Sequence, residues 1–185
     1  MPLFDYGQPA TFRSEASYAI TVVALEWRAH SVVRSGDAGE FRRFMANTTK
    51  GVYAFEAWLD SQGARSIVYV GKTDRTVGDR LADPRNSLQH VGDWLGDRFV
   101  LWSDVVDLTV RWAAVGDESF VEPVEQVLIA AHAPAFNSQL CRPDLRRNPQ
   151  AESLVIMNVG DKGRLMPVVA GAYYSSNGSL WPPAT

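Results

Sequence analysis

The alternation of apolar and polar residues predicts a small sheet in the middle of the chain. Residues 51–59 (GVYAFEAWL) and 65–71 (RSIVYVG) are rich in β-branched and aromatic residues, and the turn formers Asp and Gly lie between them. Residues 107–115 (DLTVRWAAV) alternate apolar with polar side chains, which is typical of a half-buried strand. We therefore expect a hairpin that is joined by a third strand.

Helical spacing of apolar residues predicts helices on both sides of these strands. Apolar residues recur at mostly helical spacing over about residues 14–33, and a second, short helix is expected over residues 38–47. We interpret residues 1–50 as an N-terminal helical support layer. After the hairpin, a short helix runs up to Pro84, and residues 120–134 (FVEPVEQVLIAAHAP) form a longer helix that a proline ends.

The last part of the chain carries two strand-like apolar runs, residues 153–159 (SLVIMNV) and 165–174 (LMPVVAGAYY). We expect a core over residues 51–140 and a C-terminal extension, residues 141–185, that packs on it. The order of the elements indicates an α+β fold. Its centre would be a small mixed or antiparallel three-stranded sheet flanked by helices, with the N-terminal helical layer and the C-terminal extension added to it.

Composition excludes several classes of protein. The single cysteine, Cys141, excludes an intramolecular disulfide and a cysteine-cluster zinc site. No apolar run approaches the length that spans a membrane, and the first residues lack the pattern of a secretory signal. We therefore expect a cytoplasmic protein without a membrane partner. The net charge of −3 argues against a nucleic-acid partner, although a sum hides where the charges lie.

Two tyrosines in the hairpin form the first candidate pair. With a turn centred on Gln62, Leu59 would pair with Arg65, and Tyr53 and Tyr69 would become diagonal neighbours on one face of the sheet. A single bulge would break this alignment. The simpler alternative for two tyrosines in strands is aromatic packing.

Three charged residues lie where they could take part in chemistry. Lys72 follows Gly71 at the change from strand to helix, a place where backbone N–H groups can meet an anion. Arg80 leans on the apolar side of the next helix and can reach the sheet edge, although a surface ion pair with a neighbouring aspartate is the simpler alternative. Glu125 points along an apolar helix face, where a bare carboxylate is costly unless it is an edge residue that reaches solvent.

In combination these residues resemble the GIY-YIG nuclease superfamily. The two naming motifs read here Gly51-Val52-Tyr53 and Tyr69-Val70-Gly71, with the tyrosines sixteen positions apart. Arg80 follows Gly71 by nine positions, as the arginine of the family does. The family's Glu-x-x-Leu-Ile…Pro-x-x-Asn block is similar to Glu125-Gln126-Val127-Leu128-Ile129 with Pro134 and Asn137. The resemblance covers residues 50–140, about half of the chain.

The resemblance implies a metal-dependent endonuclease that hydrolyses phosphodiester bonds. It implies that Glu125 binds one Mg²⁺ or Mn²⁺ ion, and that Tyr53 orients or deprotonates the attacking water. Tyr69 would hold the scissile phosphate or assist the base, and Arg80 would neutralise charge in the transition state. Lys72 would help to lower the pKa of Tyr53 or of the water, since a free tyrosine titrates near pH 10, far above the range of a base.

The resemblance also implies supporting positions, and it has one departure. Gly51 and Gly71 would support the tyrosines, and Asn137 would brace the long helix and the Glu125 side chain. Restriction-type members of the family often carry His or Tyr one helical turn after the arginine, where this chain has Pro84. His90 could take that part after a loop, or it could be an ordinary loop histidine.

The organisation of the chain favours the stand-alone type II restriction endonucleases within that superfamily. The sequence shows no zinc finger and no helix–hairpin–helix repeat, so recognition of double-stranded DNA would come from the same compact unit. A palindromic target would then require a two-fold homodimer. The alternatives are a structure-specific, repair or phage-type nuclease, an RNA-cleaving toxin of the same superfamily, and a nucleic-acid-binding module without activity.

The position of the charges weakens the objection to DNA. Residues 91–125 carry eight acidic and two basic groups, so the rest of the chain carries +3. Fifteen of the eighteen basic residues are Arg, which suits bidentate contacts to phosphate and guanine. We expect residues 93–122 to face away from a duplex. The residues expected to contact DNA are Arg75, Arg85, Arg142, Arg146 and Arg147.

Overall fold

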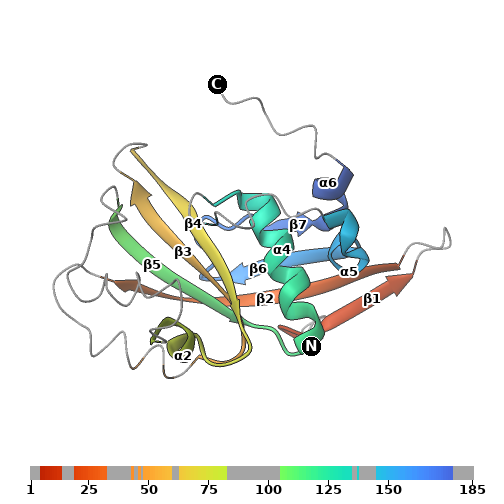
Figure 1. Ribbon diagram of the computed structural model, residues 1–185, viewed down its shortest axis with the longest axis horizontal. Helices are drawn as coiled ribbons and strands as arrows, with labels where there is room; N and C mark the ends of the chain where they lie inside the picture. The colour runs from red at the N-terminus through yellow and green to blue at the C-terminus, as the bar shows by residue number, and fades with distance from the viewer. Residues whose placement is uncertain are drawn as a thin grey trace.

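A mixed seven-stranded sheet carries a long helix across one of its faces (Figure 1). The computed structural model describes residues 5–13, 19–32, 43, 46, 48–59, 63–82, 105–134, 137 and 145–176. The strands are β1 (Pro9–Arg13), β2 (Ala19–Val32), β3 (Gly51–Leu59), β4 (Ala64–Thr73), β5 (Val105–Ala114), β6 (Leu154–Gly160) and β7 (Val168–Ala170). The helices are α2 (Val77–Ala82), α4 (Val121–His132), α5 (Pro149–Glu152) and α6 (Gly171–Ser176), with short 3-10 turns η1 (Glu118–Phe120) and η2 (Leu145–Arg147).

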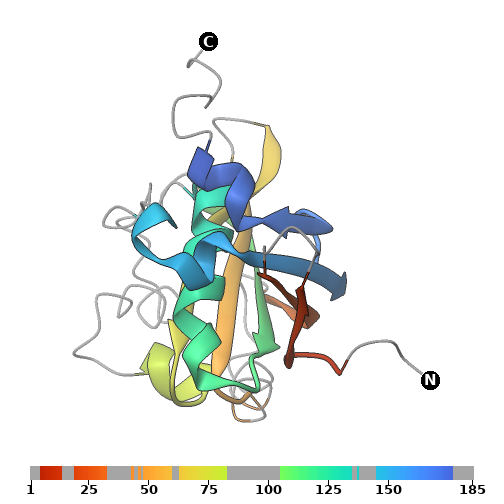
Figure 2. The same cartoon turned by 90° about the vertical axis from the view of Figure 1, so that its right-hand side faces the viewer.

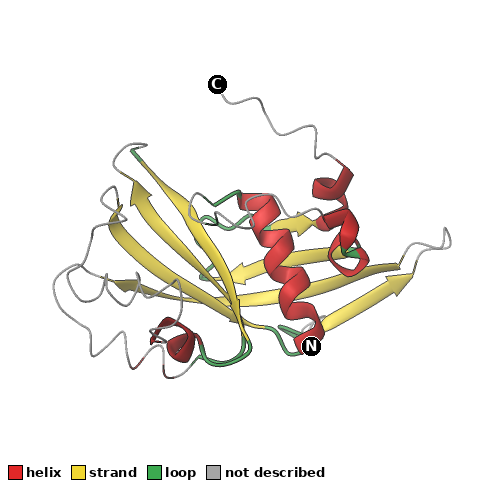
Figure 3. Cartoon of the chain, in the orientation of Figure 1, coloured by secondary structure: helices red, strands yellow, loops and turns green. Residues whose placement is uncertain are grey.

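Strand β2 joins the two halves of the sheet. The strand order is β4-β3-β5-β2-β6-β7, and β1 also pairs with β2. Residues Ala19–Val23 of β2 pair with β1 and Thr21–Trp27 pair with β6, whereas its last residues, Arg28 to Val32, pair with β5. Only the pair of β2 with β6 is parallel among the described strands. Figure 3 shows the long strand β2 running along the long axis of the molecule, with β1 below its right-hand part.

Apolar side chains between α4 and the sheet form the core. Val124 and Leu128 of α4 are fully buried, and they belong to one cluster with Leu25 of β2, Val52 of β3 and Ile156 of β6. Burying a side chain of this kind contributes about 1.5–3 kcal/mol. Helices α5 and α6 lie beside α4 (Figure 2). The N-terminal, middle and C-terminal parts of the chain therefore share one core.

The prediction of an N-terminal helical layer is wrong, because β1 and β2 take its place. In β2, Val23, Leu25 and Trp27 are buried while Glu26 is exposed, which is the two-residue period of a strand. The apolar residues of this segment are dense enough to match a helical spacing as well, and pairing with three neighbouring strands decides between the two. Of the short helix expected over residues 38–47, only Arg43 and Ala46 lie within the described residues, and both are helical.

The α+β class is confirmed, but the predicted three-stranded sheet is too small. Strands β4, β3 and β5 lie side by side as expected, and β2, β6, β7 and β1 extend them. The predicted hairpin, both predicted helices after it and the strand at residues 153–159 are present as β3–β4, α2, α4 and β6. The run at residues 165–174 divides into β7 and the start of α6. None of the described helices is both long and apolar enough to cross a membrane.

Strand β5 is buried on both faces, which corrects the prediction of a half-buried strand. Its polar residues Thr109 and Arg111 are buried. Arg111 donates from Nε to Glu56 Oε2 at 3.1 Å, and its Nη1 donates to the carbonyl oxygen of Asp161. The backbone N–H of Arg164 donates to the same oxygen of Glu56 at 2.8 Å. A buried ion pair therefore ties β3 and β5 to the segment between β6 and β7.

We expect Glu56→Gln to lower the free energy of unfolding by about 3–5 kcal/mol, because it leaves the Arg111 guanidinium buried without its carboxylate. Urea unfolding measures this change. Glu26→Gln removes an exposed carboxylate from β2 and serves as the control, with a change within about 0.5 kcal/mol. Equal effects of the two substitutions would contradict a stabilising part for the buried pair.

Candidate active site

The register of the hairpin differs from the predicted one at the turn. Leu59 pairs with Ala64, whereas the sequence predicted a pair with Arg65. Because side chains alternate between the faces of a sheet, a shift of one residue reverses the face of every side chain on one strand. Left uncorrected, this shift would place Tyr53 and Tyr69 on opposite faces.

A β-bulge cancels that shift. The register changes between Phe55 and Glu56, so that Phe55 pairs with Tyr69 and Tyr53 pairs with Gly71. The rings of Tyr53 and Tyr69 are stacked, with centroids 6.1 Å apart. The two phenols are therefore the diagonal neighbours that the sequence predicted, because the bulge and the shift at the turn cancel.

Gly71 leaves the space that the Tyr53 side chain occupies. A Cβ atom at Gly71 would lie 2.6 Å from the hydroxyl oxygen of Tyr53 and 2.8 Å from Cε1 of Tyr69. Gly51 is equally constrained, since a Cβ there would lie 2.2 Å from the carbonyl oxygen of Ala113. The two motif glycines thus allow the Tyr53 ring to cross β4 and allow β3 to approach β5.

Asn137 covers part of the open edge of β4. Its Nδ2 donates to the carbonyl oxygen of Val70 at 2.7 Å, and its Oδ1 accepts the N–H of Val70 at 2.8 Å. Val70 also pairs with Ala54 of β3, so its two backbone groups that bond Asn137 point away from the sheet. Asn137 therefore braces the strand that carries Tyr69.

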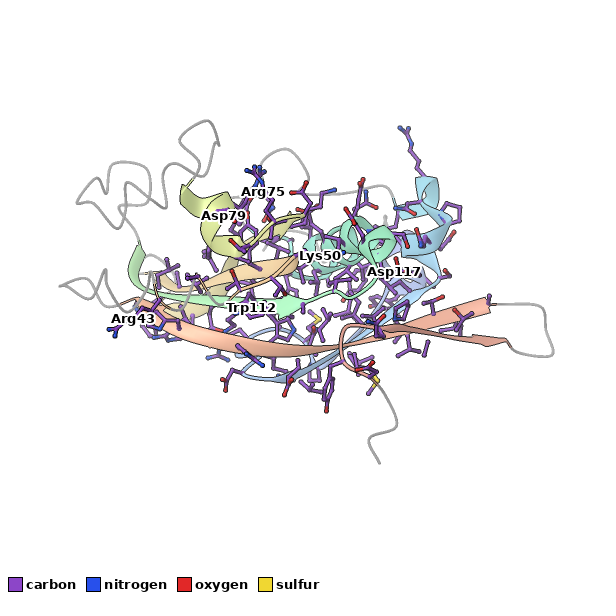
Figure 4. The ribbon with its side chains drawn as sticks, turned by 90° about the horizontal axis from the view of Figure 1, so that it is seen from below. Arg43, Lys50, Arg75, Asp79, Trp112 and Asp117 are labelled. Carbon is purple, nitrogen blue, oxygen red and sulfur yellow. The ribbon has the colours of Figure 1, made fainter. Side chains whose placement is uncertain are left out.

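A capping network begins α2 and so places Arg80. Thr48 Oγ1 accepts the N–H groups of Val77 at 2.9 Å and of Gly78 at 3.3 Å. Thr76 Oγ1 accepts a further N–H of the first turn at 2.9 Å. Arg80 follows on this turn, and its positive charge acts on the phenol of Tyr53 and on the carboxylate of Glu125. Figure 4 shows α2 with its labelled neighbours, and Lys50 and Asp117 towards the beginning of α4.

Glu125 is a buried carboxylate at the edge of β4. Its side chain is 9% exposed, and Lys72 Nζ lies 3.8 Å from its Oε2. Burial raises the pKa of Glu125 to about 7, although Lys72 and Arg80 act in the opposite direction. The positive charges beside Glu125 therefore stabilise its ionised form less than the lost hydration would have done.

Both phenols are held in the neutral state. Burial and then the neighbouring Tyr69 raise the pKa of Tyr53 well above its ordinary value, and Arg80 opposes them. Burial and the charge of Glu125 raise the pKa of Tyr69. Among the described residues, Tyr69 and Arg80 lie near the Tyr53 hydroxyl, but neither meets it in good hydrogen-bond geometry. Among the described residues, Arg80 is the cation that acts on Tyr53, and Lys72 contacts the carboxylates of α4.

Glu122 is a residue of this site that the sequence did not indicate. Its Oε2 lies 2.9 Å from Lys72 Nζ, closer than the carboxylate of Glu125. One signal could have identified it, because Glu122 precedes Glu125 by three positions and residues at that spacing share one side of a helix. Glu122 lies inside the stretch 93–122 that we expect to face away from a duplex, and its contact with Lys72 places it beside the candidate site.

The remaining candidate residues fall into three groups. Arg75 and Arg147 are exposed, and Arg75 lies next to α2 (Figure 4). Arg146 is described only by its backbone in η2. The candidates outside the described residues are Pro84, Arg85, His90 and Arg142.

The candidate site surrounds the edge of β4, with Tyr53 and Tyr69 on one face, Lys72 and Glu125 on the face of α4, and Arg80 beyond the end of the strand. No three His, Cys, Asp or Glu side chains among the described residues form a metal-binding group, so Glu125 would hold a metal ion mainly together with water. No protein-family model matches this chain, and neither a curated protein nor a solved structure is significantly similar to it.

We expect Tyr53→Phe to keep or raise the free energy of unfolding, by up to about 2 kcal/mol, because it removes a buried hydroxyl that lacks a well-formed hydrogen bond among the described residues and keeps the ring. Thermal unfolding of the metal-free protein measures the change. Tyr69→Phe removes a less buried hydroxyl and is the control, with a smaller change expected. A clear loss of stability in Tyr53→Phe would show that the hydroxyl has a structural partner.

The pKa of Glu125 predicts a pH-dependent effect of its substitution. A folded-state pKa of about 7, above the ordinary 4.5, means that ionising Glu125 costs stability, and that this cost grows as pH rises from 4.5 through 7. In chelator-treated protein, Glu125→Gln should therefore raise the free energy of unfolding by about 1–3 kcal/mol near pH 8 and by much less near pH 4. The same difference at both pH values would contradict a buried, ionising carboxylate.

Proposed function

We propose that this chain is a metal-dependent DNA endonuclease of the GIY-YIG type that hydrolyses phosphodiester bonds. The observation that carries the proposal is the gathering of Tyr53, Tyr69, Arg80 and Glu125 around one strand edge, from β3, β4, α2 and α4. A buried phenol that lacks a well-formed hydrogen bond among the described residues and a carboxylate with a raised pKa both cost stability. Perturbed groups that converge in this way are typical of an active site.

The residues fit one hydrated divalent cation. Glu125 supplies a single buried carboxylate whose charge Lys72 and Arg80 leave partly uncompensated. Mg²⁺ or Mn²⁺ would supply the missing positive charge, and a hard cation that keeps most of its waters needs few protein ligands. When bound, the cation would polarise the phosphate and assist protonation of the leaving oxygen through a bound water.

The other side chains would act on the phosphate and on the water. The Arg80 guanidinium would bind phosphate oxygens and neutralise the charge that develops on them. The Tyr53 hydroxyl would hydrogen-bond the attacking water and orient it towards phosphorus, and Tyr69 would hold a non-bridging oxygen. The positive charge of Arg80 favours ionisation of Tyr53, which is what transfer of the water proton to this phenol would require.

The proposed reaction is a direct displacement by water. A bond forms from the water oxygen to phosphorus, and the bond from phosphorus to the leaving sugar oxygen breaks. The attacking water loses one proton, and the leaving oxygen gains one. No covalent bond to the protein forms in this scheme, so its side chains orient, bind and move protons only.

Double-stranded DNA is the substrate that we propose. The chain carries fifteen Arg residues, and the exposed Arg75 lies just before α2, the helix that carries Arg80. Binding to phosphates by such residues weakens as salt rises. Within this class we propose a cytoplasmic, site-specific type II restriction enzyme, which would act on a palindromic site as a homodimer.

Cleavage of plasmid DNA by the purified chain tests this function. We expect discrete fragments with Mg²⁺ or Mn²⁺. A smear would indicate a non-specific or structure-specific nuclease, and cleavage of RNA alone would indicate an RNA-cleaving toxin. Binding without cleavage of either nucleic acid would indicate an inactive binding module, and neither binding nor cleavage would reject the proposal.

Substitutions at the site test the assigned residues. We expect Glu125→Ala, Arg80→Ala and Tyr53→Phe each to lower the cleavage rate by about 100-fold or more, because each removes a group aimed at the reacting atoms. Gel-shift binding of DNA should persist. Glu118→Gln removes an exposed carboxylate that precedes α4 and should keep the rate. A joint loss of folding and binding in the three variants would make these residues structural.

A further inference from the structure

The ammonium group of Lys72 lies between two carboxylates of α4. Its Nζ is 2.9 Å from Glu122 Oε2 and 3.8 Å from Glu125 Oε2. The Glu122 side chain is 60% exposed, whereas that of Glu125 is 9% exposed. A buried carboxylate gains more from a cation than an exposed one does, because charges attract more strongly where water is excluded. Charge compensation alone would therefore draw Lys72 to Glu125, and yet its closer contact is with Glu122.

Glu122 is held in place from its other side. Gln126 Nε2 donates to Glu122 Oε1 at 3.3 Å, and Asn148 Nδ2 donates to Gln126 Oε1 at 2.9 Å. Asn148 is itself fixed, because its Oδ1 accepts the N–H of Ala151 and caps α5. A chain of side-chain contacts thus runs from the beginning of α5 to Lys72, and it restricts the rotamers of Glu122.

We propose that Glu122 is a positioning residue that holds the Lys72 ammonium away from Glu125, so that a divalent cation can reach the Glu125 carboxylate. The inference rests on the proposed function, because it concerns the same metal site. An ammonium paired directly with Glu125 would occupy the oxygens that the ion needs and would repel its charge. At Glu122 the ammonium still offsets the repulsion between the two carboxylates.

The contacts of Glu122 favour this role over that of a second metal ligand. One of its oxygens contacts Lys72 and the other accepts from Gln126. Binding a metal ion through either oxygen would break one of these contacts. Its exposure also means that water already solvates it, so it gains less than Glu125 does from a cation.

Calorimetric titration of the full chain with Mn²⁺ alone tests the proposal without substrate or cleavage. We expect Glu122→Gln to weaken Mn²⁺ binding by about threefold to fivefold, because Lys72 then has Glu125 as its remaining carboxylate. In a Lys72→Met background the same substitution should change the affinity much less, since no ammonium is left to hold. Glu118→Gln removes a carboxylate that contacts Lys50 instead, and this matched control should keep the wild-type affinity.

Two outcomes would overturn the proposal while leaving the nuclease function in place. Equal weakening by Glu122→Gln in both backgrounds would mean that Glu122 acts on the metal directly. Unchanged affinity in both backgrounds would mean that the contact with Lys72 has no bearing on the metal. Failure of the wild-type chain to bind Mn²⁺ at all would instead overturn the proposed function, and this inference with it.

Discussion

Strand β2 fixes the geometry of the whole sheet, because its hydrogen bonds pass from one set of partners to another along its length. Its first part pairs with β1 and β6, and its last part pairs with β5. Strand β5 pairs with β3, and β3 pairs with β4, so the pairing of β2 with β5 positions the sheet edge where the tyrosines lie. Helix α4 packs against both halves through one core. The separation between Glu125 and the hairpin therefore depends on residues far from either.

The groups that cost stability are concentrated at that edge. An edge strand leaves backbone groups without a strand partner, and the side chain of Asn137 satisfies those of Val70. The cost of burying the Tyr53 hydroxyl and the Glu125 carboxylate is not offset to the same extent by their neighbours. Natural proteins tolerate such local costs where the remaining core is sufficient, and these costs fall where a ligand could remove them.

Local signals allowed part of this structure to be predicted. The hairpin, α2 and α4 each have a clear period and a proline or glycine at an end, and Tyr53, Arg80 and Glu125 could be placed on them. Strand β2 could not be predicted, because its identity depends on pairing with β5 and with β6, which lies more than a hundred residues away in the sequence. The contact of Glu122 with Lys72 could not be predicted either, because it forms only when α4 lies along β4.

The bulge in β4 holds one residue that would otherwise lie in the turn of the hairpin. Between the paired residues Leu59 and Ala64 the turn is one residue shorter than a hairpin without a bulge would need, and the strand holds the extra residue instead. Either arrangement keeps the same number of residues between Tyr53 and Tyr69 and the same face for both. During evolution, a residue could therefore pass from the turn to the strand while the phenols kept their positions. The number of residues between the two motifs would stay the same, so the spacing in the sequence would not reveal the change.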